Sequence, residues 1–176
     1  MSNTSATGGY LVESGVLSRI KIEDIWHGVI SGITGIAPKL VRPNYQNEPG
    51  ATIGAGDTYA IFGLKNDTAI EYPETYHIGT GDGTTVVIDQ VRKLLTVSFY
   101  GELADDKADM FRRALHIGQN REALRRAGIA VVRVGNPEAV PELVNEKWLR
   151  RVDMEIVTVY EAVGKYDILN LLRALS

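Results

Sequence analysis

The spacing of apolar residues predicts two helical regions in the chain. Between residues 22 and 33 the apolar side chains recur at helical spacing, at Ile25, Val29, Ile30 and Ile33. We expect this amphipathic helix to end before Gly35, because glycine is common just after the last turn of a helix. A second helical pattern covers residues 103–126, with a break at Gly118, and Gly128 ends it.

Alternating and β-branched runs predict the strands. In residues 91–100, Leu95, Val97 and Phe99 fall on one face of a strand and the residues between them on the other. The nearly continuous apolar run 129–134 predicts a buried strand. Further strands are expected at 39–42, 59–64 and 147–163, with 70–78 as an edge strand or a loop because Pro73 interrupts it.

Stretches rich in glycine, asparagine and proline are expected to connect these elements. Residues 44–57, NYQNEPGATIGAGD, predict a long loop, and GTGDGTT at 79–85 predicts a hairpin tip. GNPEAVPEL at 135–143 predicts a loop with one helical turn, and 168–172 a strand or short helix. The order of elements predicts an α+β fold, a mainly antiparallel β-sheet flanked by α-helices.

Composition narrows the class of protein. The chain has 176 residues, a formal net charge of -3 and no cysteine, which excludes disulfides, thiolate zinc sites and thiol nucleophiles. That charge gives no general attraction to nucleic acid or to an anionic membrane. No apolar run is long enough to cross a bilayer, and the first residues do not resemble a secretory signal, so we expect an intracellular protein. We expect residues 1–20 to form a flexible arm and residues 21–176 a single domain.

The motif ADDKAD places Asp105, Asp106 and Asp109 at the D-D-x-x-D spacing that some enzymes use to hold magnesium. Magnesium needs near-octahedral oxygen ligands, and a second facing carboxylate cluster is missing from the sequence. Acidic residues in a first helical turn also interact favourably with the helix dipole, and Asp109 can pair with Arg112 or Arg113. We therefore interpret the motif as a helix start and predict no metal site.

Other candidate chemistry is equally weak. GAGD at 54–57 resembles the sugar-kinase signature in which the aspartate is a base, but it precedes a strand pattern instead of a helix. GTGDG at 79–83 lacks both the strand-then-helix context and the lysine of a phosphate-binding loop. The histidines, His27, His77 and His116, form no metal-binding pair. We predict no catalytic residues and no cofactor.

The segment NEKWLRRVDMEIVTVYEAV at 145–163 is the most unusual strand pattern. As one strand it places Trp148, Arg150, Val152, Met154, Ile156, Thr158 and Tyr160 on one side. The other side carries Leu149, Arg151, Asp153, Glu155, Val157, Val159 and Glu161. The ionic half of this second side suits a wet interface between subunits, the wall of a water-filled channel, or simply a solvated sheet face.

The layout of the chain resembles that of the tail terminator (neck) proteins of tailed bacteriophages. The resemblance covers roughly residues 20–163. It rests on the helix IEDIWHGVISGIT, the segment VRPNYQNEP, the strand end VSFYG leading into ADDKADMFRRAL, and the strand NEKWLRRVDMEI. It implies a small α+β subunit without catalytic residues that assembles as a ring, commonly a hexamer. The segment YLVESGVLSR departs from this pattern.

The resemblance also implies partners and a location. The ring would contact copies of itself, the tail tube and its sheath protein, and the head-tail connector. It would pass DNA without specific binding, because an acidic lining does not hold phosphates. The resemblance places the protein in the tail or neck of the virion, assembled in the host cytoplasm and away from membranes.

We assign site residues on this basis. Subunit interface residues are predicted to be Trp148, Arg150, Arg151, Arg112 and Arg113, and lumen-facing residues Asp153 and Glu155. Loops that order when a partner docks are predicted to contain Tyr45, Gln46, Asn47, Gly54, Gly56, Gly81 and Asp82. Two alternatives stay open at this point. One is a head-tail joining or minor tail protein of related fold, and a more distant one is a small-molecule enzyme that uses Asp57 or Asp105 and Asp109.

Overall fold

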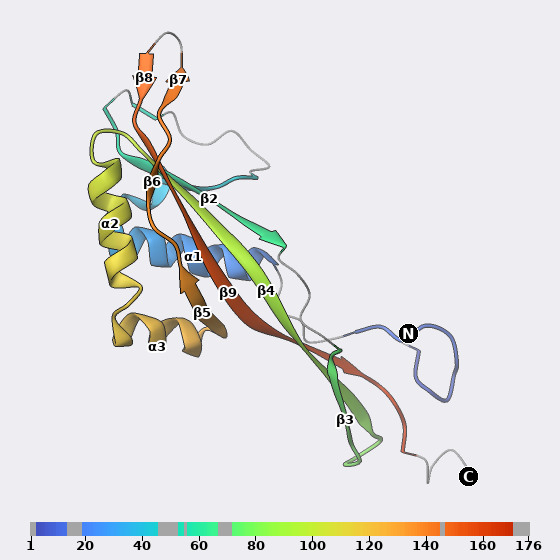
Figure 1. The fold of residues 1–176 in the computed structure, drawn as a ribbon. Coiled ribbons are helices and arrows are strands. Elements are labelled where there is room, and N and C mark those ends of the chain that lie inside the picture. Colours follow the sequence, from blue (N-terminus) through green and yellow to red (C-terminus); the bar gives the residue numbers. More distant parts are fainter. Residues whose placement is uncertain are drawn as a thin grey trace. The chain divides into compact units, whose positions relative to one another are not determined.

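The computed structural model of the chain describes residues 3–13, 19–45, 53–54, 56–66, 72–144 and 147–170. Its helical elements are α1 (Arg19–Thr34), the 3-10 helix η1 (Pro38–Leu40), α2 (Ala104–Ala114) and α3 (Gly118–Arg126). Its strands are β1 (Val41–Pro43), β2 (Tyr59–Asn66), β3 (Glu74–Ile78), β4 (Thr84–Tyr100), β5 (Ile129–Val134), β6 (Glu138–Ala139), β7 (Glu142–Val144), β8 (Lys147–Leu149) and β9 (Arg151–Tyr166) (Figure 1). The predicted α+β class is confirmed.

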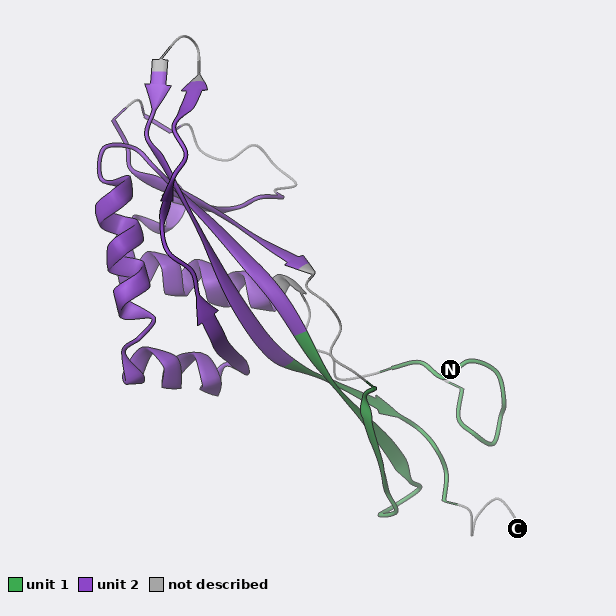
Figure 2. Ribbon diagram, viewed as in Figure 1, with its two compact units in different colours: residues 1–18, 69–91, 161–176 green, residues 19–68, 92–160 purple. Residues whose placement is uncertain are grey.

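The chain divides into two compact units (Figure 2). Unit 1 contains residues 1–18, 69–91 and 161–176, and unit 2 contains residues 19–68 and 92–160. Strands β4 and β9 each contribute residues to both units. Among the described helices, none is long and apolar enough to span a bilayer.

The core of unit 2 lies between one face of the sheet and the helices. The sheet has the strand order β1-β2-β4-β9-β5. Strand β1 runs parallel to β2, while the β2–β4 and β5–β9 pairs are antiparallel. On the covered face, Phe62 of β2 lies opposite Val97 of β4, and both are buried. Phe99 meets Phe111 of α2 edge-on at 6.0 Å, and Trp26 of α1 is completely buried.

The other face of this sheet carries no helix in the described part of unit 2. Figure 1 shows α1 passing behind the strands, on the covered side. The side chains of Leu95, Val97 and Phe99 point to the covered side, as the alternation predicted. The alternate residues of β4, including Tyr100, therefore occupy the open face. The break in the second helical region is also confirmed, since α2 ends before Gly118 and α3 begins there. Gly128 follows α3 with φ +83°, a conformation that glycine adopts without strain.

Several predicted elements differ in detail from the structure. The strand predicted at 147–163 is broken at Arg150, because β8 pairs with β7 in a separate two-stranded sheet. Residues 135–143 contain β6 and the start of β7 in place of a helical turn, and β6 pairs with β9. The run 129–134 is not a fully buried strand: β5 is an edge strand with a bulge near Val132, whose side chain is 53% exposed.

Unit 1 contains the predicted hairpin tip. Strands β3 and β4 pair from Glu74 opposite Ile88 to Ile78 opposite Thr84. The side-chain amide of Asn170 donates to the carbonyl oxygens of Gly79 and Gly81 at 2.9 and 3.2 Å, which closes the turn from outside. All five residues of β3 are exposed, as expected for an edge strand.

Candidate functional site

Two tyrosines and an arginine form a polar cluster on the open face of unit 2. Tyr59 and Tyr100 lie opposite each other on β2 and β4, and their rings stack at 4.6 Å with an interplanar angle of 3°. The guanidinium of Arg151, at the start of β9, lies 5.6 Å from the centre of the Tyr100 ring. At this distance the cation is attracted to the face of the ring. The cluster therefore links three neighbouring strands.

Arg151 also joins the β7–β8 hairpin to the main sheet. Its Nε and Nη2 donate to the two carboxylate oxygens of Asp153 at 2.8 and 2.9 Å. Its Nη1 donates to Oε2 of Glu142, at the start of β7, at 3.2 Å. The Arg151 side chain is 29% exposed, so these charge-assisted bonds are partly shielded from water. One guanidinium thus fixes the base of the hairpin.

The same contacts determine the protonation of the cluster. The hydrogen bond to Asp153 raises the pKa of Arg151 above its usual range, so this side chain stays charged. Burial raises the pKa of Tyr100, an effect that nearby Arg151 partly opposes. Burial, assisted by the Glu142 carboxylate, also raises the pKa of Tyr59. Both phenols therefore hold their protons more tightly than free tyrosine does.

The β7–β8 hairpin presents apolar side chains to solvent. Leu143 and Trp148 are cross-strand partners, and they are 58% and 72% exposed. A cavity of about 450 Å³ borders Trp148 and is lined by Gly56, Gly101, Glu102, Leu149 and Arg150. A second cavity of about 460 Å³ borders the same tryptophan, with Asp105, Ala139, Pro141 and Arg151 in its wall. The Trp148 side chain therefore borders two surface cavities.

The predicted interface cations all lie near carboxylates of their own chain. Arg150 contacts Asp105 at 3.4 Å, and Arg112 and Arg113 each lie 3.8 Å from Asp109. Trp148 and Arg150 do not share a face with the buried residues of β9, contrary to the single-strand prediction. The interface roles of these residues and of Arg151 stay predictions.

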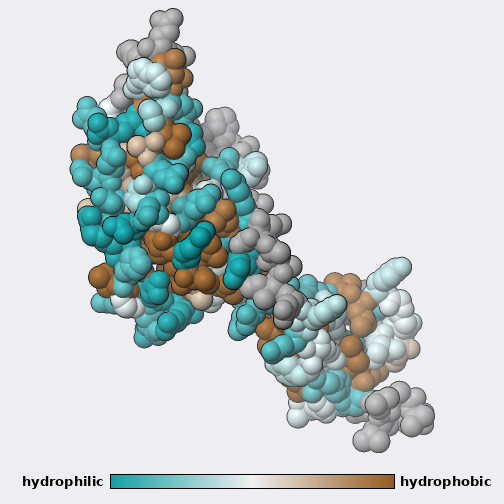
Figure 3. Space-filling view, in the orientation of Figure 1, coloured by the Kyte–Doolittle hydropathy of each residue, from teal (hydrophilic) through white to brown (hydrophobic). Residues whose placement is uncertain are grey.

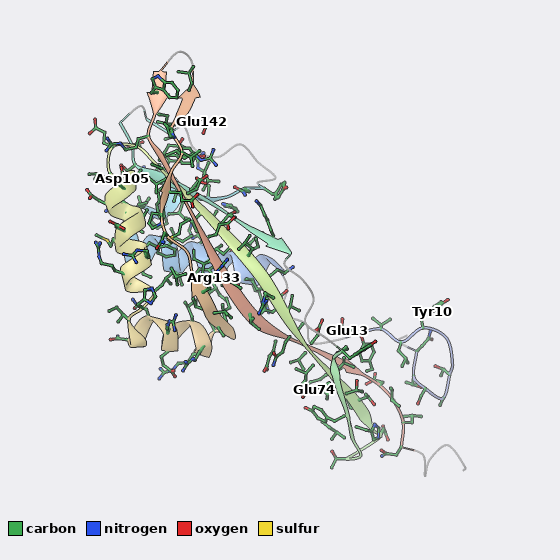
Figure 4. All side chains as sticks on the ribbon, viewed as in Figure 1. Tyr10, Glu13, Glu74, Asp105, Arg133 and Glu142 are labelled. Atoms are coloured by element: carbon green, nitrogen blue, oxygen red, sulfur yellow. The ribbon has the colours of Figure 1, made fainter. Side chains whose placement is uncertain are left out.

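The predicted lumen residues lie on the open face, where strand alternation placed them. Asp153 is engaged by Arg151, whereas the side chain of Glu155 is exposed. A cavity of about 470 Å³ is lined by Arg133, Asp153 and Glu155 together with residues of the β5–β6 connection. Arg133 belongs to β5 and to unit 2, as do these carboxylates (Arg133 is labelled in Figure 4). A cation therefore accompanies the two predicted carboxylates.

The predicted docking loops fall into different parts of the chain. Tyr45 is exposed, and Gln46 and Asn47 lie outside the described residues. The amide of Gly54 donates to the Asp57 carboxylate at 2.8 Å, which closes a turn, and Gly56 borders the first cavity beside Trp148. These residues belong to unit 2.

Gly81 and Asp82 lie at the β3–β4 tip in unit 1, where the backbone of Asn170 donates to the Asp82 carbonyl at 3.1 Å. Their docking role, like that of the unit 2 loops, stays a prediction.

The residues considered for enzyme chemistry serve local structure. Asp57 accepts the Gly54 amide, Asp105 pairs with Arg150, and Asp109 pairs with two arginines of α2. Within the described ranges there is no group of three or more side chains suited to bind a metal. The D-D-x-x-D spacing begins a helix, since Asp105 and Asp106 occupy the first turn of α2.

Sequence reasoning missed both tyrosines of the polar cluster, Tyr59 and Tyr100, and also Glu142, which binds Arg151. Alternation along residues 91–100 already placed Tyr100 on the face opposite Phe99. Its partners could not be found from the sequence, because Tyr59 meets it only through the β2–β4 register and Glu142 only through Arg151. Pairing between distant segments leaves no local signal.

Comparison with protein families gives one match. A family model described as phage neck terminator protein matches residues 21–174, nearly the whole chain. No curated protein matches the sequence. The match covers all of the cluster, both cavities beside Trp148 and the predicted lumen residues.

Proposed function

Because the chain belongs to the phage neck terminator protein family and is thus a structural protein of the phage tail or neck, we propose that it acts as the tail terminator subunit itself. In this proposal copies of the chain, six being the expected number, form a ring. The ring ends the tail tube, touches the surrounding sheath and offers a surface to the head-tail connector. It assembles in the host cytoplasm and remains in the virion.

The family match over residues 21–174 carries the proposal. The fold supports it in two ways. Unit 2 has one face covered by helices and one open face with both charged and aromatic side chains, which suits a subunit that meets neighbours or a water-filled channel. The acids that the motifs suggested for catalysis are engaged in a turn, in a pair within α2 and in an ion pair with Arg150, which fits structural roles for them.

The mass of the purified protein by light scattering, with negative-stain imaging of the same fractions, tests the proposal. We expect a ring of about six copies with a central hole, either for the protein alone or after purified tail tube is added. Rings attached to tube ends would support the terminator role. A protein that remains monomeric with tube present, or rings that bind connector but never tube, would contradict it.

A further inference from the structure

We propose that neighbouring copies join head to tail through two different patches of unit 2, an inference that rests on the ring proposed above. The first patch, the hairpin end, comprises Leu103, Val140, Leu143 and Trp148 with the charged residues around them. The second patch, the helix corner, comprises Met110, Arg112, Arg113, Ile117 and Arg121 where α2 meets α3. The occupant of each patch is the other patch of a second copy.

The hairpin end has the composition of a protein contact. Its four apolar side chains are all at least 41% exposed, and Trp148 is the most exposed of them. Exposed tryptophan is costly in a free subunit and is enriched among residues that dominate interface energies. The cavities on both sides of Trp148 give side chains of a neighbour a place to insert. Arg151 holds the hairpin in place through Glu142, so the patch is already formed before docking.

The hairpin end is acidic. Carboxylates outnumber cations among its residues, with Glu102, Asp105, Asp106, Glu138 and Glu142 against Lys147, Arg150 and Arg151. The two arginines are already bound by Asp105, Asp153 and Glu142. The remaining charge seen by an approaching protein is therefore negative.

The helix corner has the opposite charge and its own apolar side chains. Met110 and Ile117 are 40% and 55% exposed. Around them lie three arginines, Arg112, Arg113 and Arg121, of which Arg121 donates to the carbonyl oxygen of Leu115 at 2.9 Å, against the carboxylate of Asp109. Figure 3 shows apolar atoms at the surface both on the β7–β8 hairpin and where α2 meets α3. Each patch thus offers an apolar centre with charges complementary to the other.

The two patches lie at opposite ends of unit 2. Helix α2 connects them, because Asp105 in its first turn contacts Arg150 beside the hairpin and Arg113 is in its last turn (Figure 1). If each patch met its own copy, like charges would face each other, which opposes such a contact. Contact between unlike patches has the head-to-tail geometry from which rings close.

Cross-linking between introduced cysteines tests this arrangement, since the natural chain has no cysteine. The variant with both Leu143→Cys and Ile117→Cys carries one thiol in each patch, and each single variant carries only one. All are treated with a short thiol-specific bismaleimide at concentrations where rings form, with tube present if rings require it. The matched control replaces Ile117→Cys by Val132→Cys on β5, which is almost equally exposed at 53%.

We expect the double variant to give a covalent ladder that ends at the size of the ring, and each single variant to remain uncross-linked. Dimers from either single variant would show that a patch meets itself and would overturn the inference. A ladder of equal strength from the Val132→Cys control, or rings without any ladder, would overturn it while leaving the ring proposal intact. The absence of both rings and ladders would overturn both proposals.

Substitution of the proposed anchor gives an independent readout. Trp148→Ala should weaken ring association about 30-fold or more, as truncation of a dominant interface residue does. The monomer should keep its thermal stability, because the Trp148 side chain is largely exposed. Tyr72→Ala, which removes another exposed aromatic side chain, in unit 1, serves as the control and should leave ring mass unchanged. Equal effects of the two substitutions would contradict the assignment of Trp148.

Discussion

Arg151 shows how one side chain can hold two parts of a fold together. Three of its nitrogens bind carboxylates on β7 and β9, and its central guanidinium carbon lies over the Tyr100 ring, 5.6 Å from the ring centre. Lysine would supply the charge without the planar fork that serves both carboxylates at once. The residue therefore matters for geometry as much as for charge, and its contribution can be measured.

We expect Arg151→Ala to lower the free energy of unfolding by about 1–3 kcal/mol, because Asp153 and Glu142 lose a shared partner in a partly buried site. Urea denaturation measures this change. Arg113→Ala, which removes an ion pair from a side chain that is 65% exposed, should change it by less than about 0.5 kcal/mol. Equal effects of both substitutions would show that the cluster has no special role. Arg151→Lys should fall between the two.

The stacked tyrosines predict a loss of stability in alkali. The pKa of Tyr100 is higher in the folded chain than its ordinary value of 10.0, so the folded state binds this proton more tightly than the unfolded state. The stability that the tighter binding of this proton contributes is fully present below pH 10.0. It is lost as the pH rises from that value through the pKa of Tyr100 in the folded state.

Thermal unfolding measured from pH 8 to 11, with tyrosinate absorbance followed in parallel, tests this expectation. Tyr100→Phe should flatten the decline of stability above the ordinary tyrosine pKa, because the titrating phenol is absent. Tyr72→Phe, at a side chain that is 98% exposed, should leave the decline as it is. An unchanged decline in Tyr100→Phe would assign it to other groups.

At the scale of elements, Gly101 determines how β4 leads into α2. Its φ is +102°, and a Cβ atom built there would lie 2.7 Å from the carbonyl oxygen of Asp57 and 3.0 Å from Cα of Thr58. The residue thus permits close approach of the segment that precedes β2. Gly128, after α3, has a φ of +83° but open space around the position of its Cβ.

These two glycines form a matched pair. Gly128→Ala should cost about 1 kcal/mol of stability from backbone strain alone. Gly101→Ala should cost at least about 2 kcal/mol, because the methyl group adds a backbone clash to the same strain. Denaturant unfolding of both variants measures the difference. Equal costs would mean that the Asp57–Thr58 segment moves away freely.

The elements also show what the sequence could and could not predict. Helix α1 and the break before α3 were predictable, because helical spacing and glycine act within a few residues. The buried face of β9 was predictable for the same reason, since Val152, Met154 and Ile156 alternate. The end of β8 before Arg150 depends on pairing with β7, and the exposure of Val132 depends on a bulge against β9. Such pairings involve distant segments, and so does the contact of Tyr59 with Tyr100.

At the scale of the whole molecule, the predicted lumen position of the open face can be tested through its effect on DNA binding. Of the two carboxylates predicted to face the lumen, Asp153 is bound by Arg151, and Glu155 is exposed. Replacing Glu155 would therefore change the charge that faces DNA in the proposed ring, and it would disturb the fold less than replacing Asp153. Asp153 is unsuitable for this test, because its replacement would also release Arg151 and the hairpin.

We expect Glu155→Arg to raise the affinity of assembled rings for double-stranded DNA about tenfold or more at low salt, since each copy adds a cation that can contact phosphate. The gain should fall steeply as salt increases, and filter binding across a salt series measures both effects. Glu74→Arg makes the same change of charge at an exposed position on β3 of unit 1, which is not among the residues predicted to face the lumen (Figure 4). If both variants bound DNA equally, net charge alone would explain the gain, and the open face of unit 2 would not line the DNA path.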